Sequence, residues 1–460
     1  MTRKLPHTAL AVMAALTLHT GIAAASGNVH EYQLDNGMKI LVKEDHRAPV
    51  VTSMVWYKVG SSYEHDGITG VSHLLEHMMF KGTKSHPPGE FSRIIAANGG
   101  RENAFTSRDY TAYFQSLEAS RLPISFELEA DRMRNINILD EEFAKEIEVV
   151  KEERRMRTED KPESLTYEQF SATAYMASPY RWPVIGWMSD LDNMTAEDAR
   201  QWYKTWYAPN NATLAVAGDV DADEVFELAK KYFGPLEPSV IPPLKARKDV
   251  VQRGERRIIV KAPAELPYLI MGYKVPTIAT DRDSSEPYAL AVLASILDGG
   301  NSARLARNLI RGEQIVSGAG ASYNPFSRLD NLFLFDANPA QGHTIDEAEA
   351  AIRKEIAKLQ ETLVSDEELA RVKAQVIAGE VYEKDSVFYQ AMQLGSLTTV
   401  GLDWRIGEQY ADRIQQVSAE QVREVAKKYL IDDTLTVGIL EPQPLDHPVA
   451  PPGRATTILR

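Results

Sequence analysis

The chain contains no cysteine, so no disulfide can stabilise it. A chain of this length buries enough surface to be stable by packing alone, and its stability must therefore come from its core. Long apolar runs are also missing beyond residue 25, because charged residues interrupt every such run within about a dozen positions. These absences exclude a disulfide scaffold and predict a mature chain without a membrane span.

Basic residues are fewer than acidic residues in this sequence. The sequence has 51 lysines and arginines against 65 aspartates and glutamates, which gives a formal net charge of −14. This balance argues against general nucleic-acid binding, and no polybasic patch is available for anionic lipid. We give the acidic excess no catalytic meaning.

The first 25 residues have the features of a secretory signal. Arg3 and Lys4 are followed by a mostly apolar stretch from Thr8 to Ala25, and alanines at 23–25 form a typical cleavage site. An uncut membrane anchor is the alternative, but the apolar run is short and contains His19. We expect export to the periplasm with cleavage near Ala25.

An internal repeat indicates that the rest of the chain is two related halves. Residues 195–216 run from an N-capped amphipathic helix into an apolar strand, and residues 418–437 repeat this pattern. Prolines cluster between 235 and 243, where helical and strand periodicity lapses. The predicted division is a signal peptide at 1–25, an N-terminal domain at 26–238, a linker at 239–250 and a C-terminal domain at 251–460.

Strand and helix patterns alternate irregularly in both halves. Strands are predicted at 31–34, 38–42, 50–59, 103–106, 109–114, 257–261 and 268–275, the first two joined by a tight turn. Helices are predicted at 91–98, 121–134, 140–158 and 286–297. We predict an α+β fold of two related halves, each a mainly antiparallel sheet with helices packed on one face.

The most informative stretch is 70–83, whose centre reads His73-x-x-Glu76-His77. In a helix these three side chains share one face. Two imidazoles suit Zn²⁺, and the carboxylate can take a proton from a water bound to that metal. A surface helix with scattered histidines is the alternative. The flanking residues are apolar, which places the helix in a core; they are Val71, Leu74, Leu75 and Met78. Polar groups are buried in a core only where they have partners, so the flanking residues favour a metal site.

A third ligand is expected from the helix at 140–158. Glu146, Val149, Val150 and Glu153 recur at the spacing of an inward-facing stripe, which leaves both glutamates open as the ligand. In the second half, the corresponding segment 294–298 has no histidine, so we expect no metal site there.

Together these motifs resemble the insulinase/pitrilysin (M16-type) family of inverted-zincin metallopeptidases, which includes the mitochondrial processing peptidases. The resemblance rests on residues 73–83, on Asn-Ala-Phe-Thr at 103–106 and on the Glu146 and Glu153 pair, and it covers nearly the whole mature chain. It implies a processing-peptidase-like fold and one zinc ion per chain, held by His73, His77 and Glu153.

The resemblance also implies roles for other residues. Glu76 would activate the water, and Glu146 would hydrogen-bond around the metal site. The strand with Asn103, Ala104 and Phe105 would bind a peptide as an added strand; an ordinary edge strand is the alternative.

One family feature is incomplete. Active members usually carry an arginine followed by a tyrosine in the second half, and both contact the substrate carbonyl. Arg311 is present, but Ser317 stands where the tyrosine is expected, and Tyr323 fits an ordinary strand residue better. Losing such a contact costs about 2–4 kcal/mol of transition-state stabilisation. We therefore expect a heterodimer with a related subunit that supplies an Arg/Tyr pair; a homodimer is the alternative.

The predicted function is that of a zinc metalloendopeptidase acting on peptides or unfolded segments. Two other functions stay open: a catalytically weak or silent subunit for peptide binding or assembly, and a dedicated protease that matures one precursor. The complete set of His73, Glu76, His77 and Glu153 argues against a silent subunit.

Overall fold

The computed structural model describes residues 29–245 and 247–445. The predicted signal peptide at 1–25 lies outside these residues. Within the described part, none of the helices combines the length and the apolar character that a membrane crossing requires.

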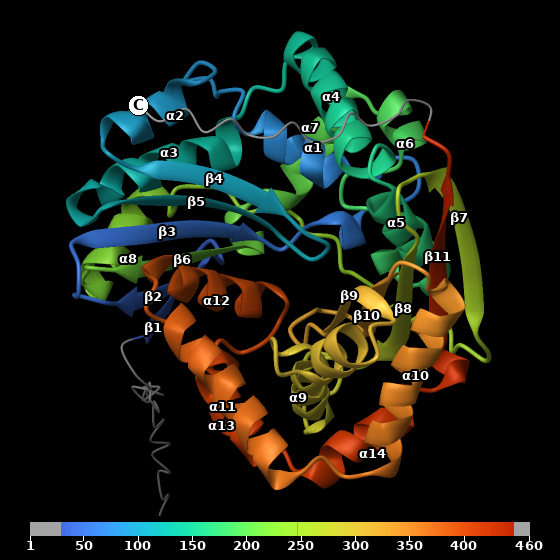
Figure 1. The fold of residues 1–460 in the computed structure, drawn as a ribbon. Helices are drawn as coiled ribbons and strands as arrows, with labels where there is room; N and C mark the ends of the chain where they lie inside the picture. Colours follow the sequence, from blue (N-terminus) through green and yellow to red (C-terminus); the bar gives the residue numbers. More distant parts are fainter. Residues whose placement is uncertain (1–28, 246, 446–460) are drawn as a thin grey trace, which may run out of the picture.

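The first half is built on a six-stranded sheet in the order β1-β2-β6-β3-β5-β4 (Figure 1). Neighbouring strands are antiparallel except for β2 and β6, which are parallel. The strands are β1 Val29–Gln33, β2 Lys39–Glu44, β3 Val50–Tyr57, β4 Arg101–Thr106, β5 Thr111–Glu118 and β6 Ala212–Gly218. Strand β4 therefore forms one edge of this sheet.

Helices of the first half bury one face of that sheet in a large core, to which Leu74, Phe126 and Trp202 contribute. The helices are α1 Val71–Met78, α2 Glu90–Ala97, α3 Leu122–Asn135, α4 Asp140–Arg154, α5 Pro162–Ala174, α6 Met188–Asn193, α7 Ala196–Trp206 and α8 Ala222–Tyr232. Short 3-10 turns lie at Ser61–Tyr63, Ala119–Arg121, Pro179–Arg181 and Pro209–Asn211, and a π-helical turn at Arg155–Glu159 follows α4.

The second half has a five-stranded sheet in the order β7-β11-β8-β10-β9. Its strands are β7 Arg256–Pro263, β8 Tyr268–Val275, β9 Val316–Ser322, β10 Asn331–Pro339 and β11 Leu435–Gln443. Its helices are α9 Glu286–Asp298, α10 Ile345–Glu361, α11 Asp366–Glu383, α12 Val387–Thr399, α13 Arg405–Gln416 and α14 Ala419–Tyr429, with a π-helical turn at Leu305–Gly312 and a 3-10 turn at Asp432–Thr434. Only β7 and β11 are parallel among its neighbouring strands.

The structure confirms the repeat. Helix α7 begins at a capping box on Thr195 and leads into β6, and helix α14 begins at a capping box on Ser418 and leads into β11. Each of these strands pairs parallel with one neighbour and antiparallel with the other. The predicted α+β fold of two related, mainly antiparallel halves is confirmed.

The second face of each sheet is covered by a helix from the other half, an arrangement the sequence did not predict (Figure 1). Helix α12 packs Ala391 and Leu394 against Trp56 of the first sheet. Conversely, Phe170 of α5 lies against the second sheet with Ile270. The two halves are thus joined by an exchange of helices across their sheets.

The elements match the predicted segments closely, and the main difference lies in the helix predicted at 140–158. It is α-helical only to Arg154 and continues as a π-helical turn from Arg155. Such turns often lie at functional sites because they change which side chains share a face. Here the change follows directly after Glu153.

Candidate metal centre and cleft

Helix α1 begins with a tight turn rather than a capping side chain. Gly70 has φ 90°, and a Cβ there would lie 2.5 Å from the carbonyl oxygen of Ile185. The carboxylate of the buried Glu64 accepts hydrogen bonds from the backbone N–H groups of Gly70 (2.7 Å) and Ser72 (2.8 Å). These contacts hold the first turn of the helix that carries both histidines.

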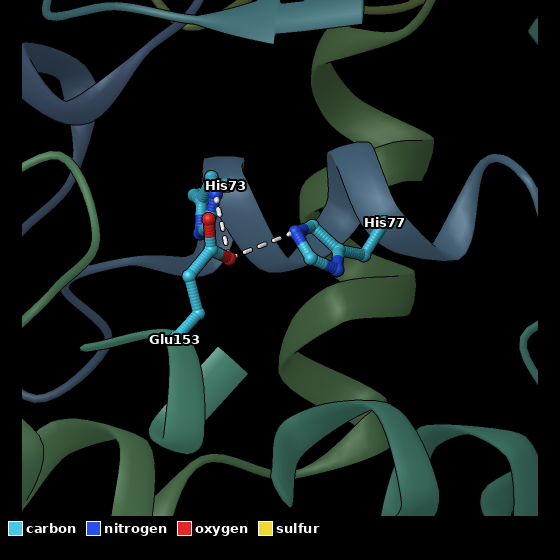
Figure 2. A group of neighbouring side chains, drawn as sticks. All are labelled: His73, His77 and Glu153. Carbon is cyan, nitrogen blue, oxygen red and sulfur yellow. Dashed lines mark ion pairs between the residues drawn. The ribbon is translucent and has the colours of Figure 1, made fainter. Parts of the chain in front are cut away.

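His73, His77 and Glu153 converge on one point between α1 and α4. Oε2 of Glu153 lies 3.6 Å from Nε2 of His73 and 3.3 Å from Nε2 of His77 (Figure 2). One potential ligand atom from each of the three side chains falls within 4.8 Å of the others. The structure therefore brings together the three residues predicted as ligands.

The chemistry of these atoms fits a bound cation. Oε2 of Glu153, which faces both histidines, and Nδ1 of His73 are buried and have no hydrogen-bond partner among the described residues. Burial, together with the charges of His77 and Arg157, lowers the pKa of His73 to about 3, so its imidazole is neutral at neutral pH. Two imidazoles and a carboxylate are the ligand set that zinc takes in catalytic sites, with one coordination position left open.

Glu146 orients the second histidine from behind. Its Oε1 lies 2.9 Å from Nδ1 of His77, and its Oε2 lies 2.5 Å from Nζ of Lys81. Burial opposes ionisation, but the hydrogen bonds from His77 and Lys81 hold the pKa of Glu146 below its usual value. An ionised carboxylate only accepts, so Nδ1 of His77 carries the proton and Nε2 is free to bind a metal.

The predicted inward stripe of α4 is only partly correct. Glu146 and Val150 are buried and Glu153 is nearly so, but Val149 is 50% exposed because it faces an open cleft. Arg154 anchors the end of the helix through Glu168 (2.7 Å) and the carbonyl oxygen of Gly186 (2.8 Å). Both glutamates that periodicity left open therefore face α1, one behind His77 and one between the histidines.

Glu76 lies on the same face of α1 and opens into the cleft. Its Oε2 accepts a hydrogen bond of 2.5 Å from Oγ1 of Thr106, the last residue of β4. Burial raises the pKa of Glu76 above that of an ordinary glutamate, although the bond from Thr106 opposes the rise. A carboxylate with a raised pKa is suited to accept a proton and later release it.

The cleft has a volume of about 1190 Å³ and is bounded by α1, α4, α5 and β4. Asn103, Ala104 and Phe105 all line it, as predicted for a strand that receives a peptide. Phe105 also packs edge-on against Trp56, with ring centroids 5.4 Å apart, so it contributes to the fold as well. Tyr268 of the second half completes the lining.

Arg311 is not brought to this cleft. It does not line it, and its Nη2 donates to the carbonyl oxygen of Asn301 at 2.5 Å. Ser317 is the second residue of β9 and donates to the carbonyl oxygen of Asn338. Tyr323 donates to the carbonyl oxygen of Pro276 at 2.6 Å and stacks on Phe333, so it has packing and hydrogen-bond partners, but it lies one residue beyond the end of β9 rather than in the strand.

Sequence reasoning assigned no role to several residues that shape the site. Thr106 could have been found from strand alternation, because it lies two residues beyond Ala104 on the same side of β4. Arg157 pairs with Oε1 of Glu153 at 2.6 Å, through a helical i, i+4 spacing. Glu64 lies in a loop without periodicity, so no local pattern indicates its contact with α1.

Comparisons with known proteins agree with this arrangement. The family model described as insulinase (peptidase family M16) matches residues 39–186, and the one described as peptidase M16 inactive domain matches residues 193–376. The zinc protease PqqE of Helicobacter pylori is 37% identical over 338 residues, which is 73% of this chain and 74% of that protein. A protein of Arabidopsis thaliana named probable mitochondrial-processing peptidase subunit beta is 26% identical over 423 residues, covering 89% of this chain and 77% of that protein.

Among solved structures, a protease from Helicobacter pylori superimposes with a TM-score of 0.86 at 31% identity, over 91% of this chain and 100% of that one. This chain has two related halves, and the first half carries a single His-x-x-Glu-His helix. This combination places it in the class of inverted-zincin metallopeptidase folds. The chain belongs to the insulinase family, peptidase family M16. Zinc-dependent proteolysis is the activity that the names of its relatives carry.

Proposed function

We propose that this protein is a zinc metalloendopeptidase that hydrolyses peptides or unfolded segments. The observation that carries the proposal is the convergence of His73, His77 and Glu153 beside Glu76, in a cleft with the edge strand β4 along one side. Among the described residues, Oε2 of Glu153 has no hydrogen-bond donor. When bound there, one zinc ion would polarise the scissile carbonyl and acidify the attacking water.

The chain's own residues account for the remaining steps. Backbone groups at Asn103 and Ala104 bind the substrate as an added strand along β4, with little dependence on its sequence. Glu76, held by Thr106, takes the proton of the attacking water and delivers it to the leaving amine. Glu146 keeps the imidazole of His77 in the orientation and tautomer that a metal needs.

We also propose that the zinc-bearing domain spans 26–238 and is connected by a linker at 239–250 to a domain at 251–460 without metal ligands. In support, residues 233–245 and 247–255 contain neither helix nor strand. The three residues grouped as a possible metal site all belong to the first half, within the part of the chain that the structure describes.

The placement of Arg311 and Ser317 supports a heterodimer in which a related subunit supplies the Arg/Tyr pair; Arg311 stays a predicted substrate contact that would act only in a paired assembly. The name of the Arabidopsis relative, a subunit of a processing peptidase, is consistent with such pairing. A homodimer remains an alternative to the heterodimer. A silent assembly subunit and a protease for a single precursor are further alternatives, which the experiment below separates from the proposed function.

The test compares wild-type protein with Glu76→Gln. Protein taken from the periplasmic fraction, with its first residue read by N-terminal sequencing, is assayed for zinc content and for cleavage of an unstructured peptide library. We expect Glu76→Gln to keep one zinc per chain and to lose about 10²- to 10⁴-fold in kcat, because only the proton acceptor is removed.

Glu127→Gln, which changes an exposed carboxylate of α3, is the matched control and should keep its activity. Repeating the assay with the product of a neighbouring related gene tests the heterodimer: full activity of the single chain would contradict it. Zinc-loaded protein inactive in both settings would mean a silent subunit, and cleavage of one precursor alone would mean a dedicated protease.

A further inference from the structure

Three arginines line the cleft, and they differ in their partners. Arg157 pairs with Glu153 at 2.6 Å, and Arg181 pairs with Asp66 at 3.2 Å. Arg108 forms no ion pair with any carboxylate in residues 29–245 and 247–445. It is therefore the cleft arginine whose charge the described chain leaves uncompensated.

Aromatic rings surround this guanidinium. Its central carbon lies 5.3 Å from the ring centroid of Tyr180 and 5.9 Å from that of Tyr175. Its hydrogen bond within the described chain is a long one, 3.4 Å from Nη2 to the hydroxyl of Tyr167. A guanidinium has five N–H donors, so most of them remain available to a ligand. Apolar walls strengthen the attraction between this cation and any anion that enters.

The neighbouring carboxylates are engaged elsewhere or are solvated. Asp109 is buried, and its oxygens accept from Ser62 (2.9 Å), from Nε of Arg328 (3.1 Å) and from the hydroxyl of Tyr180. Glu152 and Glu163 also line the cleft, on exposed faces of α4 and α5. None of these acids acts as the counter-ion of Arg108.

The backbone at Arg108 is fixed beside the reacting groups. Its carbonyl oxygen accepts from the N–H of Ser62 at 2.8 Å, and the carbonyl of Ser107 accepts from Ser61 at 3.1 Å. Arg108 follows two residues after Thr106, which holds Glu76. Because an extended chain advances about 3.3 Å per residue, a group bound at Arg108 belongs to a substrate residue only a few positions from the cleaved bond.

We infer that Arg108 binds a carboxylate of the substrate, either an acidic side chain or the free C-terminus of a peptide lying along β4. The inference rests on the proposed peptidase function and adds a substrate class to it. Arginine suits this task because its planar fork can donate two parallel hydrogen bonds to one carboxylate. The three tyrosines and the anchored backbone hold that fork in place before the substrate arrives.

The test measures peptide binding in the Glu76→Gln background, where turnover does not interfere. Fluorescent unstructured peptides of about ten residues carry a single Glu or Gln at each position in turn, with a free or an amidated C-terminus. Fluorescence anisotropy gives the Kd of each. We expect a preference of about tenfold or more for the carboxylate, as for a charge-assisted hydrogen bond. A Glu-over-Gln contrast identifies a side chain as the source, and an acid-over-amide contrast identifies the C-terminus.

Arg108→Gln should abolish this contrast, and Arg108→Lys should retain part of it. The readout is a ratio within one variant, so a general loss of folded protein cancels. Arg181→Gln is the matched control, because it removes an already paired arginine of the same cleft; it should leave the ratio unchanged. Absence of any contrast in the parent, or a contrast that survives Arg108→Gln, would overturn the inference.

The same peptides distinguish this inference from the proposed function. A contrast at Arg108, with no cleavage by zinc-loaded wild-type protein either alone or together with the related subunit, would contradict the peptidase function and leave carboxylate binding in place. Cleavage without a contrast would support the peptidase function and contradict carboxylate binding by Arg108.

Discussion

The roles of Glu146 and Glu153 differ because their carboxylates approach different nitrogen atoms of the histidines. Both lie on the side of α4 that faces α1, but Glu153 approaches Nε2 of both histidines while Glu146 approaches Nδ1 of His77. Periodicity places a side chain on a face and cannot say which nitrogen of an imidazole it meets. This is why the residue pattern alone left two candidates for the third ligand.

Replacing Glu146 by Gln should weaken zinc binding by about 10- to 100-fold, as for other partners of metal-bound histidines. The amide neither polarises Nδ1–H of His77 as strongly nor pairs with Lys81. Competition with a chromophoric chelator gives the affinity. Glu148→Gln on the exposed face of α4 is the control. Equal affinities for both variants would show that Glu146 has no part in metal binding.

At the scale of elements, α1 is held by two carboxylates at its start. Glu64 binds the N–H groups of Gly70 and Ser72, and Asp190 accepts from the N–H groups of Gly67 (3.2 Å) and Thr69 (3.1 Å). The pair replaces an ordinary cap and fixes the angle at which the helix enters the core. The position of both histidines thus depends on residues outside the motif.

This arrangement predicts a pH-dependent stability. Burial raises the pKa of Glu64 from 4.5 to about 7, with the charge of Asp190 adding to the rise and the two backbone N–H groups opposing it. Between these values the unfolded chain has lost a proton that the folded chain keeps. The free energy of unfolding should therefore fall as pH increases from about 4.5 to about 7, by up to about 3 kcal/mol from this group.

Denaturant titrations of chelator-treated protein across that range would measure the slope. Glu64→Gln carries no titrating group at this position, so its slope should be shallower, whatever its absolute stability. Parallel curves for the two proteins would show that Glu64 ionises normally in the fold.

At the scale of the whole molecule, the exchange of α5 and α12 joins the halves. Both contacts depend on glycine: a Cβ at Gly395 of α12 would lie 2.0 Å from Nε1 of Trp56, and a Cβ at Gly272 of β8 would lie 2.6 Å from the ring of Phe170. Helix α12 thereby covers the sheet that includes β4, and α5 covers the second sheet while lining the cleft. The cleft's shape therefore depends on how the halves pack.

Two helical glycines give a matched test of this packing. Gly395→Ala should destabilise the protein by about 1–3 kcal/mol through overpacking against Trp56. Gly379→Ala, in α11, adds a Cβ that meets no atom of the described residues within 4 Å, so it should stabilise by about 0.5–1 kcal/mol, since alanine favours helix. Thermal denaturation midpoints would compare them. If both variants gained stability equally, α12 would not be packed tightly on the first sheet.

The sequence by itself determined the features that follow from the regular spacing of side chains along a helix or a strand. The shared face of His73, Glu76 and His77, the inward Glu146 and the two capped helices at Thr195 and Ser418 follow from spacing alone, because helix geometry decides which side chains are neighbours. The strands and helices that were predicted follow from the same local periodicity, but helices α5, α6, α8 and α10 to α13 and strands β9 and β10 were not predicted.

Only the tertiary structure decided the contacts between segments far apart in the chain. It placed Glu64 on the start of α1, turned Val149 towards the cleft and exchanged α5 and α12 between the halves. It also left Arg108 without a carboxylate partner in the part of the chain that the structure describes. Such contacts depend on how whole elements pack, and packing of distant segments leaves no periodic pattern along a sequence.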